Sequence, residues 1–270
     1  MDSKIRELES EELREIIAGK KEKNFSIIDV REDFEYNSGH IVGANWIRLS
    51  DVEKNPDLVP DSKEVIFYCR SGARSLAAAK IFEESAKSEK TDSIRNLTKG
   101  MLGWDGATLP EPPRIDLFKG KKTFEDLLSR AMEFEKGAYL FYSAIYEKYN
   151  FLPYSDTIRI LKKAETAHAK ILFRNLGKPM DQFDSYFENI QGEIMESGIT
   201  VEEALGQIES FSENICIDLL ELLINIEASA YDLYKVLAQK NESTKSAFLT
   251  IAQEEKAHMR SIASSFILCA

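Results

Sequence analysis

The 270-residue sequence has few cysteines, no long apolar run and no block of basic side chains. Its three cysteines, Cys69, Cys216 and Cys269, are odd in number and far apart, which excludes a Cys-x-x-Cys metal knuckle and argues against a disulfide framework. We therefore expect a reducing, cytoplasmic environment, with Cys216 as a buried core thiol and Cys269 as a terminal one. The N-terminus lacks an apolar signal core, and no apolar stretch of about 18 residues is present, so the sequence predicts no membrane-spanning segment.

The balance of charge excludes further classes of partner. The formal net charge is −11, with 18 basic and 22 acidic side chains in residues 1–115 and 17 basic and 24 acidic side chains in residues 116–270. Because no basic tract or basic helix face is present, nucleic acid and membrane are excluded as expected partners. The length suits two domains, each large enough to bury its own core.

A change of pattern near residues 112–120 separates two halves. Pro110, Pro112 and Pro113 interrupt regular structure there. Before them, a helical segment at 10–19 and short apolar runs at 25–30, 44–49, 64–68 and 94–97 predict an α/β domain with a mainly parallel sheet over residues 1–115. After them, the apolar period becomes 3.6 and proline nearly disappears, which predicts an all-α domain over residues 120–270.

The most informative stretch of the first half is Tyr68-Cys69-Arg70-Ser71-Gly72-Ala73-Arg74-Ser75, which joins the apolar run 64–68 to a helical pattern over 76–86. A loop that opens a helix directs backbone N–H groups, and the positive end of the helix dipole, at its occupant. That environment and the two arginines favour a thiolate, so Cys69 is predicted to be a nucleophile. The alternatives are a small buried hydrophobic residue or a phosphate-binding loop, although the Gly-x-x-x-x-Gly-Lys-Ser/Thr pattern is missing.

Four ordered blocks over roughly residues 5–110 resemble a rhodanese domain: Ile28–Glu32, Glu35–Ala44, the Cys69 loop and Lys99–Trp104. The resemblance implies that Cys69 carries a persulfide and passes sulfane sulfur from a small donor to a thiol or to cyanide. It implies no organic cofactor. Asp29 and Arg31 are expected to hold nearby loops by hydrogen bonds. The residues implied to bind substrate are Arg70, Ser71, Gly72, Ala73, Arg74 and Ser75.

The second half contains an internal repeat. The pattern Glu-x-x-Ala-Tyr-x-x-Tyr occurs at residues 135–142 and again at 227–234. The pattern Glu-x-Ala-His occurs at 165–168 and again at 255–258. The repeat predicts two copies of one helical hairpin, joined by a crossover between Gly177 and Ser210 that holds a short helix at 201–208.

The repeated glutamates and histidines predict a metal site. Positions i and i+3 share one face of a helix, so each Glu-x-x-His presents two ligands to one point. A glutamate from each of the other two helices completes the ligand pattern of di-iron and di-manganese carboxylate bundles. Two divalent ions would cancel the charge of four buried carboxylates; the alternative is solvated glutamates with capping or core histidines. The predicted ligands are Glu135, Glu165, His168, Glu227, Glu255 and His258, holding two iron ions or another divalent pair such as manganese or zinc.

Residues 123–266 resemble the rubrerythrin branch of the ferritin-like superfamily, in which paired iron is oxidised by peroxide or dioxygen and then reduced again. Ala230 stands where that family commonly has a further glutamate, and the two Cys-x-x-Cys pairs of its rubredoxin centre are absent. The resemblance therefore implies an external electron donor, and bundles of this type often pair into homodimers. Tyr142 and Tyr234 are expected in the core, or as hydrogen-bond donors to ligand carboxylates.

Three functions are compatible with these patterns. The first is a sulfurtransferase fused to a di-iron bundle. The second is a di-iron peroxidase or oxidoreductase with the rhodanese-like domain as an accessory. The third is a non-enzymatic module for metal binding or docking.

Overall fold

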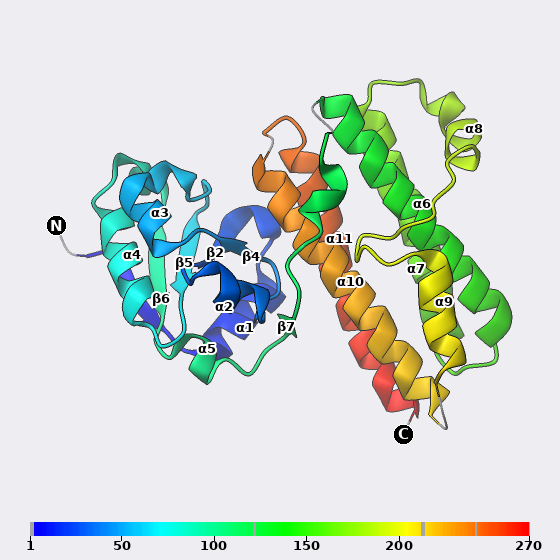
Figure 1. Ribbon diagram of the computed structural model, residues 1–270, viewed down its shortest axis with the longest axis horizontal. Coiled ribbons are helices and arrows are strands. Elements are labelled where there is room, and N and C mark those ends of the chain that lie inside the picture. Colours follow the sequence, from blue (N-terminus) through cyan, green and yellow to red (C-terminus); the bar gives the residue numbers. More distant parts are fainter. Residues whose placement is uncertain (1–2, 121–122, 212–213, 241, 270) are drawn as a thin grey trace. The chain divides into compact units, whose positions relative to one another are not determined.

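The computed structural model describes residues 3–120, 123–211, 214–240 and 242–269. The chain divides into two compact units, Met1–Pro112 and Pro113–Ala270 (Figure 1). The first unit is an α/β domain with a parallel sheet and the second is a helical bundle, which confirms the predicted fold class. The ranges 1–115 and 120–270 stay a prediction for domains that fold independently.

The first unit is built on a five-stranded sheet in the order β1-β6-β5-β2-β4, and every strand pair in it is parallel. A separate antiparallel pair joins β3 to β7. The strands are β1 Ile5–Leu8, β2 Phe25–Asp29, β3 His40–Ile41, β4 Ala44–Trp46, β5 Glu64–Tyr68, β6 Ser93–Leu97 and β7 Thr108–Leu109. The helices are α1 Ser10–Gly19, α2 Asp33–Asn37, α3 Leu49–Lys54, α4 Ala73–Glu83 and α5 Gly100–Gly103, with 3₁₀ turns at Glu22–Asn24, Pro56–Leu58 and Ala86–Lys90.

The central strand β5 fixes the position of Cys69. All five of its residues are buried, and alternate side chains enter different cores. Val65, Phe67 and Cys69 join the cluster that includes Phe82 of α4. Ile66 and Tyr68 join the other cluster. Because side chains alternate along a strand, Cys69 follows the row that faces α4.

The predicted elements of this unit differ from the observed ones at their ends. The apolar run 44–49 is a strand only as far as Trp46, since Leu49 already begins α3. The helix expected over 76–86 is α4, which begins at Ala73 and ends at Glu83. Strand β1 was not predicted; only Leu8 of its four residues is buried, so it lacks the apolar alternation that marks a strand.

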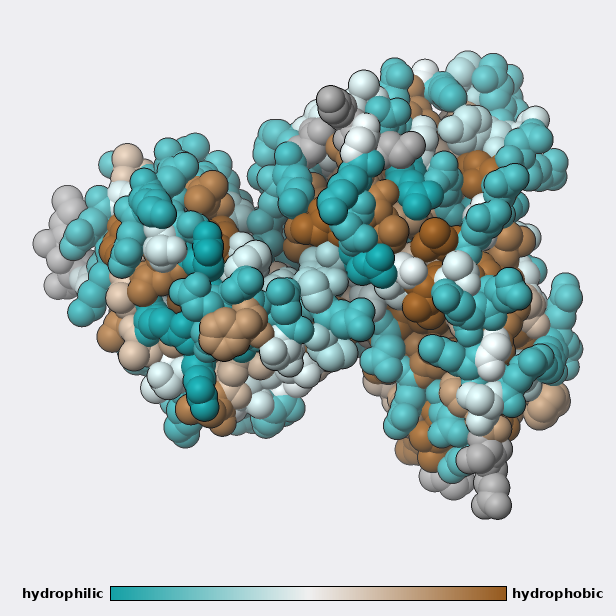
Figure 2. Space-filling model, viewed as in Figure 1, coloured by the Kyte–Doolittle hydropathy of each residue, from teal (hydrophilic) through white to brown (hydrophobic). Residues whose placement is uncertain are grey.

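The second unit is a bundle of four long helices. α6 (Phe124–Tyr149) packs with α7 (Ser155–Asn175), and α10 (Ile215–Lys240) packs with α11 (Lys245–Ser265), so the two predicted hairpins are present. The crossover between them holds α8 (Phe183–Glu188) and α9 (Val201–Glu209), the latter as expected. Three 3₁₀ turns, Ile115–Phe118, Met180–Gln182 and Phe266–Cys269, complete this unit. Figure 2 shows a mostly hydrophilic face, with hydrophobic side chains gathered along the middle of the bundle. Among the described helices, none has both the length and the apolar character that a bilayer crossing needs.

The expectation of unpaired thiols in the bundle is wrong. Cys216 and Cys269 form a disulfide with a Cα–Cα distance of 5.7 Å across 53 residues of sequence. The hairpin explains the contact, because it brings the end of α11 back to the beginning of α10, where Cys216 lies. Cys69 is the free cysteine. The pairing removes the support that unpaired thiols gave to a reducing compartment.

Candidate functional site

The backbone of the Cys69 loop depends on two glycines. Gly72 has φ +96°, and a Cβ there would lie 2.1 Å from the Thr98 carbonyl oxygen. Gly100 has φ +50°, and a Cβ there would lie 2.1 Å from the Cys69 carbonyl oxygen. No larger side chain fits either position without moving backbone.

The contact with Gly100 also orients the loop's peptide groups. The amides of Met101 and Leu102 donate hydrogen bonds to the carbonyls of Cys69 and Arg70, at 2.9 and 3.0 Å. These two carbonyl oxygens therefore accept hydrogen bonds from α5. The block Lys99–Trp104 thus supports the Cys69 loop directly.

The sulfur of Cys69 lies among hydrogen-bond donors. The Gly72 amide donates to Sγ at 3.2 Å, and the Ser75 hydroxyl lies 3.5 Å from it. The residue is only 1 % exposed. Burial alone would raise the pKa of the Cys69 thiol, but hydrogen bonds from the Ser75 side chain and from the amides of Ser75, Ser71 and Gly72 lower it below its ordinary value. The loop therefore favours an anionic sulfur.

The two arginines of the loop have different roles. Arg74 donates two hydrogen bonds to Glu35 of α2, both at 2.7 Å, which raise the pKa of Arg74 and lower that of Glu35. The charge of the Cys69 sulfur also raises the pKa of Arg74. The side chain of Arg70 is exposed. Ser71 and Ala73 are exposed as well, while Gly72 and Ser75 are buried. The amides of Ser71, Gly72 and Ser75 and the Ser75 hydroxyl act on the Cys69 sulfur, whereas the exposed side chain of Arg70 makes no described contact with it.

Asp29 and Arg31 hold the loops around this site. Nε of Arg31 lies 3.0 Å from Asp29 Oδ1 and Nη2 lies 2.6 Å from Oδ2, which is a buried bidentate pair. The same Nη2 donates to the Gly39 carbonyl at 2.7 Å. The expected hydrogen bonds are present, and they connect the end of β2 to the turn before β3.

The second candidate site is a cluster of carboxylates and imidazoles inside the bundle. Every bundle helix contributes: α6 supplies Glu135, α7 supplies Glu165 and His168, α10 supplies Glu227, and α11 supplies Glu255 and His258. Five of these residues are at most 2 % exposed. Their ligand atoms form three overlapping groups within 4.8 Å, which together include all six residues and could hold metal ions.

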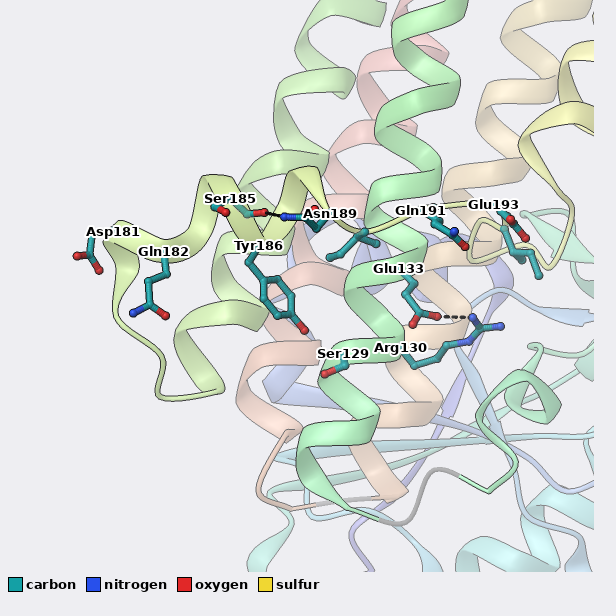
Figure 3. Close-up of a pocket in the computed structure, with 13 residues that line it drawn as sticks. Ser129, Arg130, Glu133, Asp181, Gln182, Ser185, Tyr186, Asn189, Gln191 and Glu193 are labelled. Carbon is teal, nitrogen blue, oxygen red and sulfur yellow. Dashed lines mark hydrogen bonds and ion pairs between the residues drawn. The ribbon is translucent and has the colours of Figure 1, made fainter.

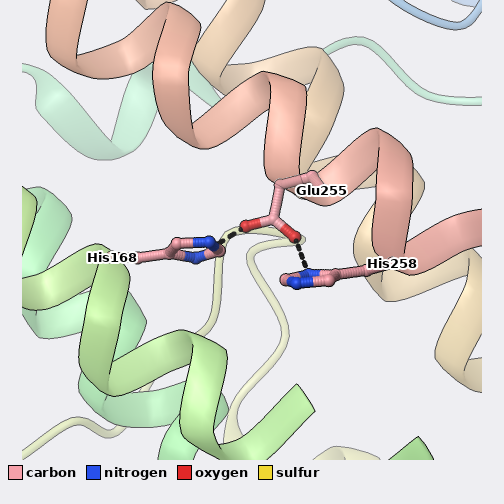
Figure 4. A group of neighbouring side chains, drawn as sticks. All are labelled: His168, Glu255 and His258. Carbon is pink, nitrogen blue, oxygen red and sulfur yellow. Dashed lines mark hydrogen bonds and ion pairs between the residues drawn. The ribbon is translucent and has the colours of Figure 1, made fainter. Parts of the chain in front are cut away.

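Glu255 lies between the two histidines (Figure 4). Its Oε1 is 3.0 Å from His168 Nδ1, and its Oε2 is 3.0 Å from His258 Nδ1. His168 Nδ1 is also 3.2 Å from Glu135 Oε2, and His258 Nδ1 is 3.0 Å from Glu227 Oε2. The Nδ1 atoms of both histidines therefore face the carboxylates.

Protons and charges in this cluster are strongly interdependent. Burial raises the pKa of Glu165 well above its ordinary value and, with the charge of Glu255, raises that of Glu227 to about 8. Burial opposes protonation of His258, yet Glu227 and Glu255 raise its pKa to about 11. Burial also opposes ionisation of Glu255. The charge of His168 and the hydrogen bonds that Glu255 forms nevertheless lower the pKa of Glu255 well below the ordinary value. Protons thus supply the positive charge that buried carboxylates need.

The residues fit a pair of divalent metal ions. His168 Nδ1 and Glu135 Oε2 are buried, and within the described ranges neither has a hydrogen-bond partner of good geometry, although they lie 3.2 Å apart. An ion between them would satisfy both atoms. Imidazole nitrogen with carboxylate oxygen suits iron, manganese and zinc.

A second set of groups forms hydrogen bonds with the predicted ligands. The hydroxyl of Tyr142 donates to Glu227 Oε1, and that of Tyr234 donates to Glu135 Oε1. The outer nitrogen of His168, Nε2, lies 3.0 Å from Glu254 Oε2, and this contact lowers the pKa of Glu254. Such outer partners fix the direction of a ligand's metal-binding atom.

The repeat aligns Glu135 with Glu227 and Glu165 with Glu255, and the neighbouring glutamates lie elsewhere. Glu133, the neighbouring carboxylate on α6, forms an ion pair with Arg130 and stays outside the three groups. Glu254 contacts the outer side of His168, whereas Glu255 lies between the histidines.

One buried carboxylate beside the cluster was not predicted. Glu196, in the crossover, is 3 % exposed, and its Oε1 lies 3.4 Å from the Tyr234 hydroxyl. Burial and the charge of Glu135 raise its pKa well above the ordinary value. No sequence signal could have found it, because the crossover lies outside both copies of the repeat.

A groove of about 920 Å³ lies between α6 and residues 181–194 of the crossover (Figure 3). Most of the residues that line it have polar side chains, among them Arg130, Glu133, Tyr186 and Asn189. None of the six predicted metal ligands lines it, so it is separate from the cluster.

Comparison with known proteins concerns the first unit. A family model described as a rhodanese-like domain matches residues 9–107. The chain is 36 % identical over 107 residues to a putative sulfurtransferase, YtwF, of Bacillus subtilis, covering 40 % of this chain and 97 % of that protein. It is 26 % identical over 106 residues to a sulfurtransferase of Allochromatium vinosum, covering 39 % and 94 %. A crystal structure of a rhodanese-like domain protein from Staphylococcus aureus aligns with a TM-score of 0.32 at 23 % identity, over 37 % of this chain and 90 % of that one. Through residues 9–107, the chain belongs to the rhodanese-like domain family.

Proposed function

We propose that the first unit is a sulfurtransferase that carries sulfane sulfur as a persulfide on Cys69. The observation that carries this proposal is the donor environment of the sulfur, with the Gly72 amide at 3.2 Å and the thiol pKa lowered by the loop's hydrogen bonds. The names of the two relatives, both sulfurtransferases, support the same reaction class.

The proposed reaction has two displacement steps. The Cys69 thiolate attacks the outer sulfur of a sulfane donor such as thiosulfate; the donor's S–S bond breaks, and sulfite leaves with the electron pair. An acceptor thiolate or cyanide then attacks the terminal sulfur of the Cys69 persulfide, and Cys69 leaves as a thiolate. The loop amides stabilise the anionic sulfur in both resting forms.

The substitution Cys69→Ser tests this proposal. We expect it to abolish thiosulfate:cyanide sulfur transfer while the unfolding midpoint stays close to that of the unchanged protein. After incubation with thiosulfate, the unchanged protein should gain the mass of one sulfur atom at Cys69, and the variant should gain none. Retained transfer by Cys69→Ser would disprove the proposal.

We further propose that the bundle binds a pair of divalent metal ions, with iron as the first candidate, in the manner of ferritin-like and rubrerythrin-like proteins. The supporting observation is the convergence of six residues from four helices, with two buried ligand atoms that lack hydrogen bonds. When bound, a pair of redox-active ions supplies one-electron steps to an oxidant such as peroxide or dioxygen. The protein side chains hold the ions and orient them, and an external donor would return the electrons.

Elemental analysis of protein purified without oxygen tests the metal proposal. We expect close to two ions per chain, lost in Glu165→Ala and kept in Glu133→Gln, whose carboxylate pairs with Arg130 outside the cluster. Bound metal without peroxide turnover would favour storage or docking over an oxidoreductase. A metal-free protein from metal-replete cells would disprove the metal site.

A further inference from the structure

The crossover inserts a tight turn into the bundle. Ile194 pairs with Thr200 across a short antiparallel bridge. The Met195 amide donates to the Ile199 carbonyl at 3.0 Å, and the Gly198 amide donates to the Met195 carbonyl at 2.9 Å. Turn tips normally face solvent. This one instead buries Met195 completely and leaves Glu196 only 3 % exposed.

A glycine of α6 makes room for this turn. A Cβ at Gly137 would lie 2.5 Å from the Ile194 carbonyl oxygen, and a Cβ at Gly192 would lie 2.8 Å from the Gly137 amide nitrogen. The two backbones therefore touch without side chains between them. The contact falls two residues from Glu135, so the crossover approaches α6 beside a predicted metal ligand.

Glu196 lies next to the cluster without a cation of its own. Its Oε1 is 3.4 Å from the Tyr234 hydroxyl, but that hydroxyl donates its single proton to Glu135. Within the described ranges, Glu196 forms no ion pair. Its own backbone amide also donates a hydrogen bond to it, but a buried carboxylate without a counter-charge is still unfavourable.

A metal pair would provide that counter-charge. The charges of three carboxylates, Glu135, Glu255 and Glu227, raise the pKa of Glu196, and all three residues are predicted metal ligands. The positive charge that gathers those three carboxylates would therefore also act on Glu196. We propose that Glu196 is a fifth carboxylate of the metal site, delivered by the crossover turn and not by a bundle helix. This inference rests on the proposed metal pair.

Titration with Co²⁺ of the full chain, freed of metal by a chelator, tests the assignment. The variant Glu196→Gln keeps the shape of the side chain and removes its charge. We expect it to bind one of the two ions about 10–100 times more weakly, the range typical for loss of a group that supports a metal site. The absorption bands of bound Co²⁺ should also change, because they depend on the number and type of ligands. Glu196→Asp keeps the charge, so its affinity for Co²⁺ should lie between that of Glu196→Gln and that of the unchanged protein.

A matched control lies in the same turn. Glu193 is exposed, and its backbone carbonyl accepts the Val201 amide at 3.0 Å, so Glu193→Gln removes an equal charge without touching the cluster. It should bind Co²⁺ as the unchanged protein does.

Stability separates a metal role from a packing role. In the metal-free protein, Glu196→Gln removes the cost of burying an ionisable carboxyl group without a counter-charge, so this variant should unfold at a higher temperature than the unchanged chain. In the Co²⁺-loaded protein the order should reverse. Identical affinity and spectrum in Glu196→Gln and the unchanged protein would overturn the assignment of Glu196 alone. Failure of the unchanged protein to bind Co²⁺ would overturn the metal pair and this assignment with it.

Discussion

The hydroxyl of Tyr142 donates a hydrogen bond to Glu227, a carboxylate that lies 85 residues later on the other hairpin. The relation is reciprocal, because Tyr234 donates to Glu135. Each copy of the repeat therefore supplies the tyrosine that holds the glutamate of the other copy. With Oε1 of Glu227 bound to Tyr142, its Oε2 is left facing His258 Nδ1 at 3.0 Å. The two hydroxyls orient the carboxylates toward the histidines.

The first prediction concerns Tyr142→Phe. The change leaves a buried carboxylate oxygen of Glu227 without its donor, so we expect the free energy of unfolding to fall by about 1–3 kcal/mol. We also expect metal affinity to fall by roughly 10–100-fold, because Glu227 is no longer held in position. Thermal unfolding and metal titration measure the two effects.

Tyr154→Phe is the matched control for this prediction. Tyr154 is 1 % exposed, and its hydroxyl donates to the Cys216 carbonyl at 2.9 Å, outside the three ligand groups. Its loss should lower stability without changing metal affinity. Equal metal affinity in Tyr142→Phe and Tyr154→Phe would contradict an orienting role for Tyr142.

The ligand cluster could be predicted because helical geometry is local. Glu165 and His168 share a helix face whatever surrounds them, and the repeat shows which of several glutamates correspond. The repeat aligns Glu135 and not Glu133 with Glu227, and Glu133 forms an ion pair with Arg130 outside the cluster. The Cys69 loop could be predicted for a similar reason, since a strand, a cysteine, a glycine and a helix follow one another within a few residues.

Contacts that depend on chain topology could not be predicted in this way. Glu196 reaches the cluster through a backbone contact between the crossover and Gly137, and nothing in its own neighbourhood marks it. Cys216 and Cys269 meet because α10 and α11 form a hairpin and the 3₁₀ turn after α11 reaches the beginning of α10, which the spacing of the cysteines does not reveal. Asn96, whose side-chain oxygen lies 2.6 Å from the Ser75 hydroxyl, comes from another strand and was missed for the same reason.

The second prediction concerns Ser75→Ala. The Ser75 hydroxyl is the largest of the hydrogen-bond contributions that lower the pKa of Cys69. Without it the thiol pKa should rise, so fewer molecules carry a thiolate near neutral pH. A hydrogen bond to a charged group contributes about 1.5–3 kcal/mol, so we expect sulfur transfer at neutral pH to slow by roughly tenfold or more.

The pH dependence of Cys69 alkylation measures this pKa shift directly. For Ser75→Ala the whole profile should move to higher pH, with the same rate at its alkaline plateau. Ser75→Thr keeps a hydroxyl and should move the profile less. A profile that stays in place in Ser75→Ala would show that the backbone amides alone set the thiol pKa.

The third prediction is the pH dependence of the metal-free bundle. Glu227 has its pKa raised from 4.5 to about 8, and His258 from 6.5 to about 11, so both groups bind protons more tightly in the folded state. Their contribution to stability is complete when the pH is below the ordinary pKa of each group. It is lost as the pH rises through the raised pKa that each group has in the folded state. The metal-free bundle should therefore become less stable as the pH rises through about 8.

Metal should remove this decline, because the ions displace the protons and bind more tightly as the pH rises. Far-ultraviolet ellipticity mainly follows the long bundle helices. Both tryptophans, Trp46 and Trp104, lie in the first unit, so their fluorescence provides an internal control. A metal-free bundle that gains stability through this pH range would contradict the proton-loaded cluster.

The fourth prediction concerns the disulfide between Cys216 and Cys269. A crosslink across 53 residues restricts the unfolded chain, so its reduction should lower the free energy of unfolding by about 2–4 kcal/mol. Denaturant unfolding with and without a reductant measures the difference, best in the Cys69→Ser background, where the reductant has no other thiol to protect. The double variant Cys216→Ser, Cys269→Ser should show the lower stability and should not respond to the reductant. The unchanged protein, denatured without reductant, should expose a single reactive thiol from Cys69; three reactive thiols would show that the crosslink does not form.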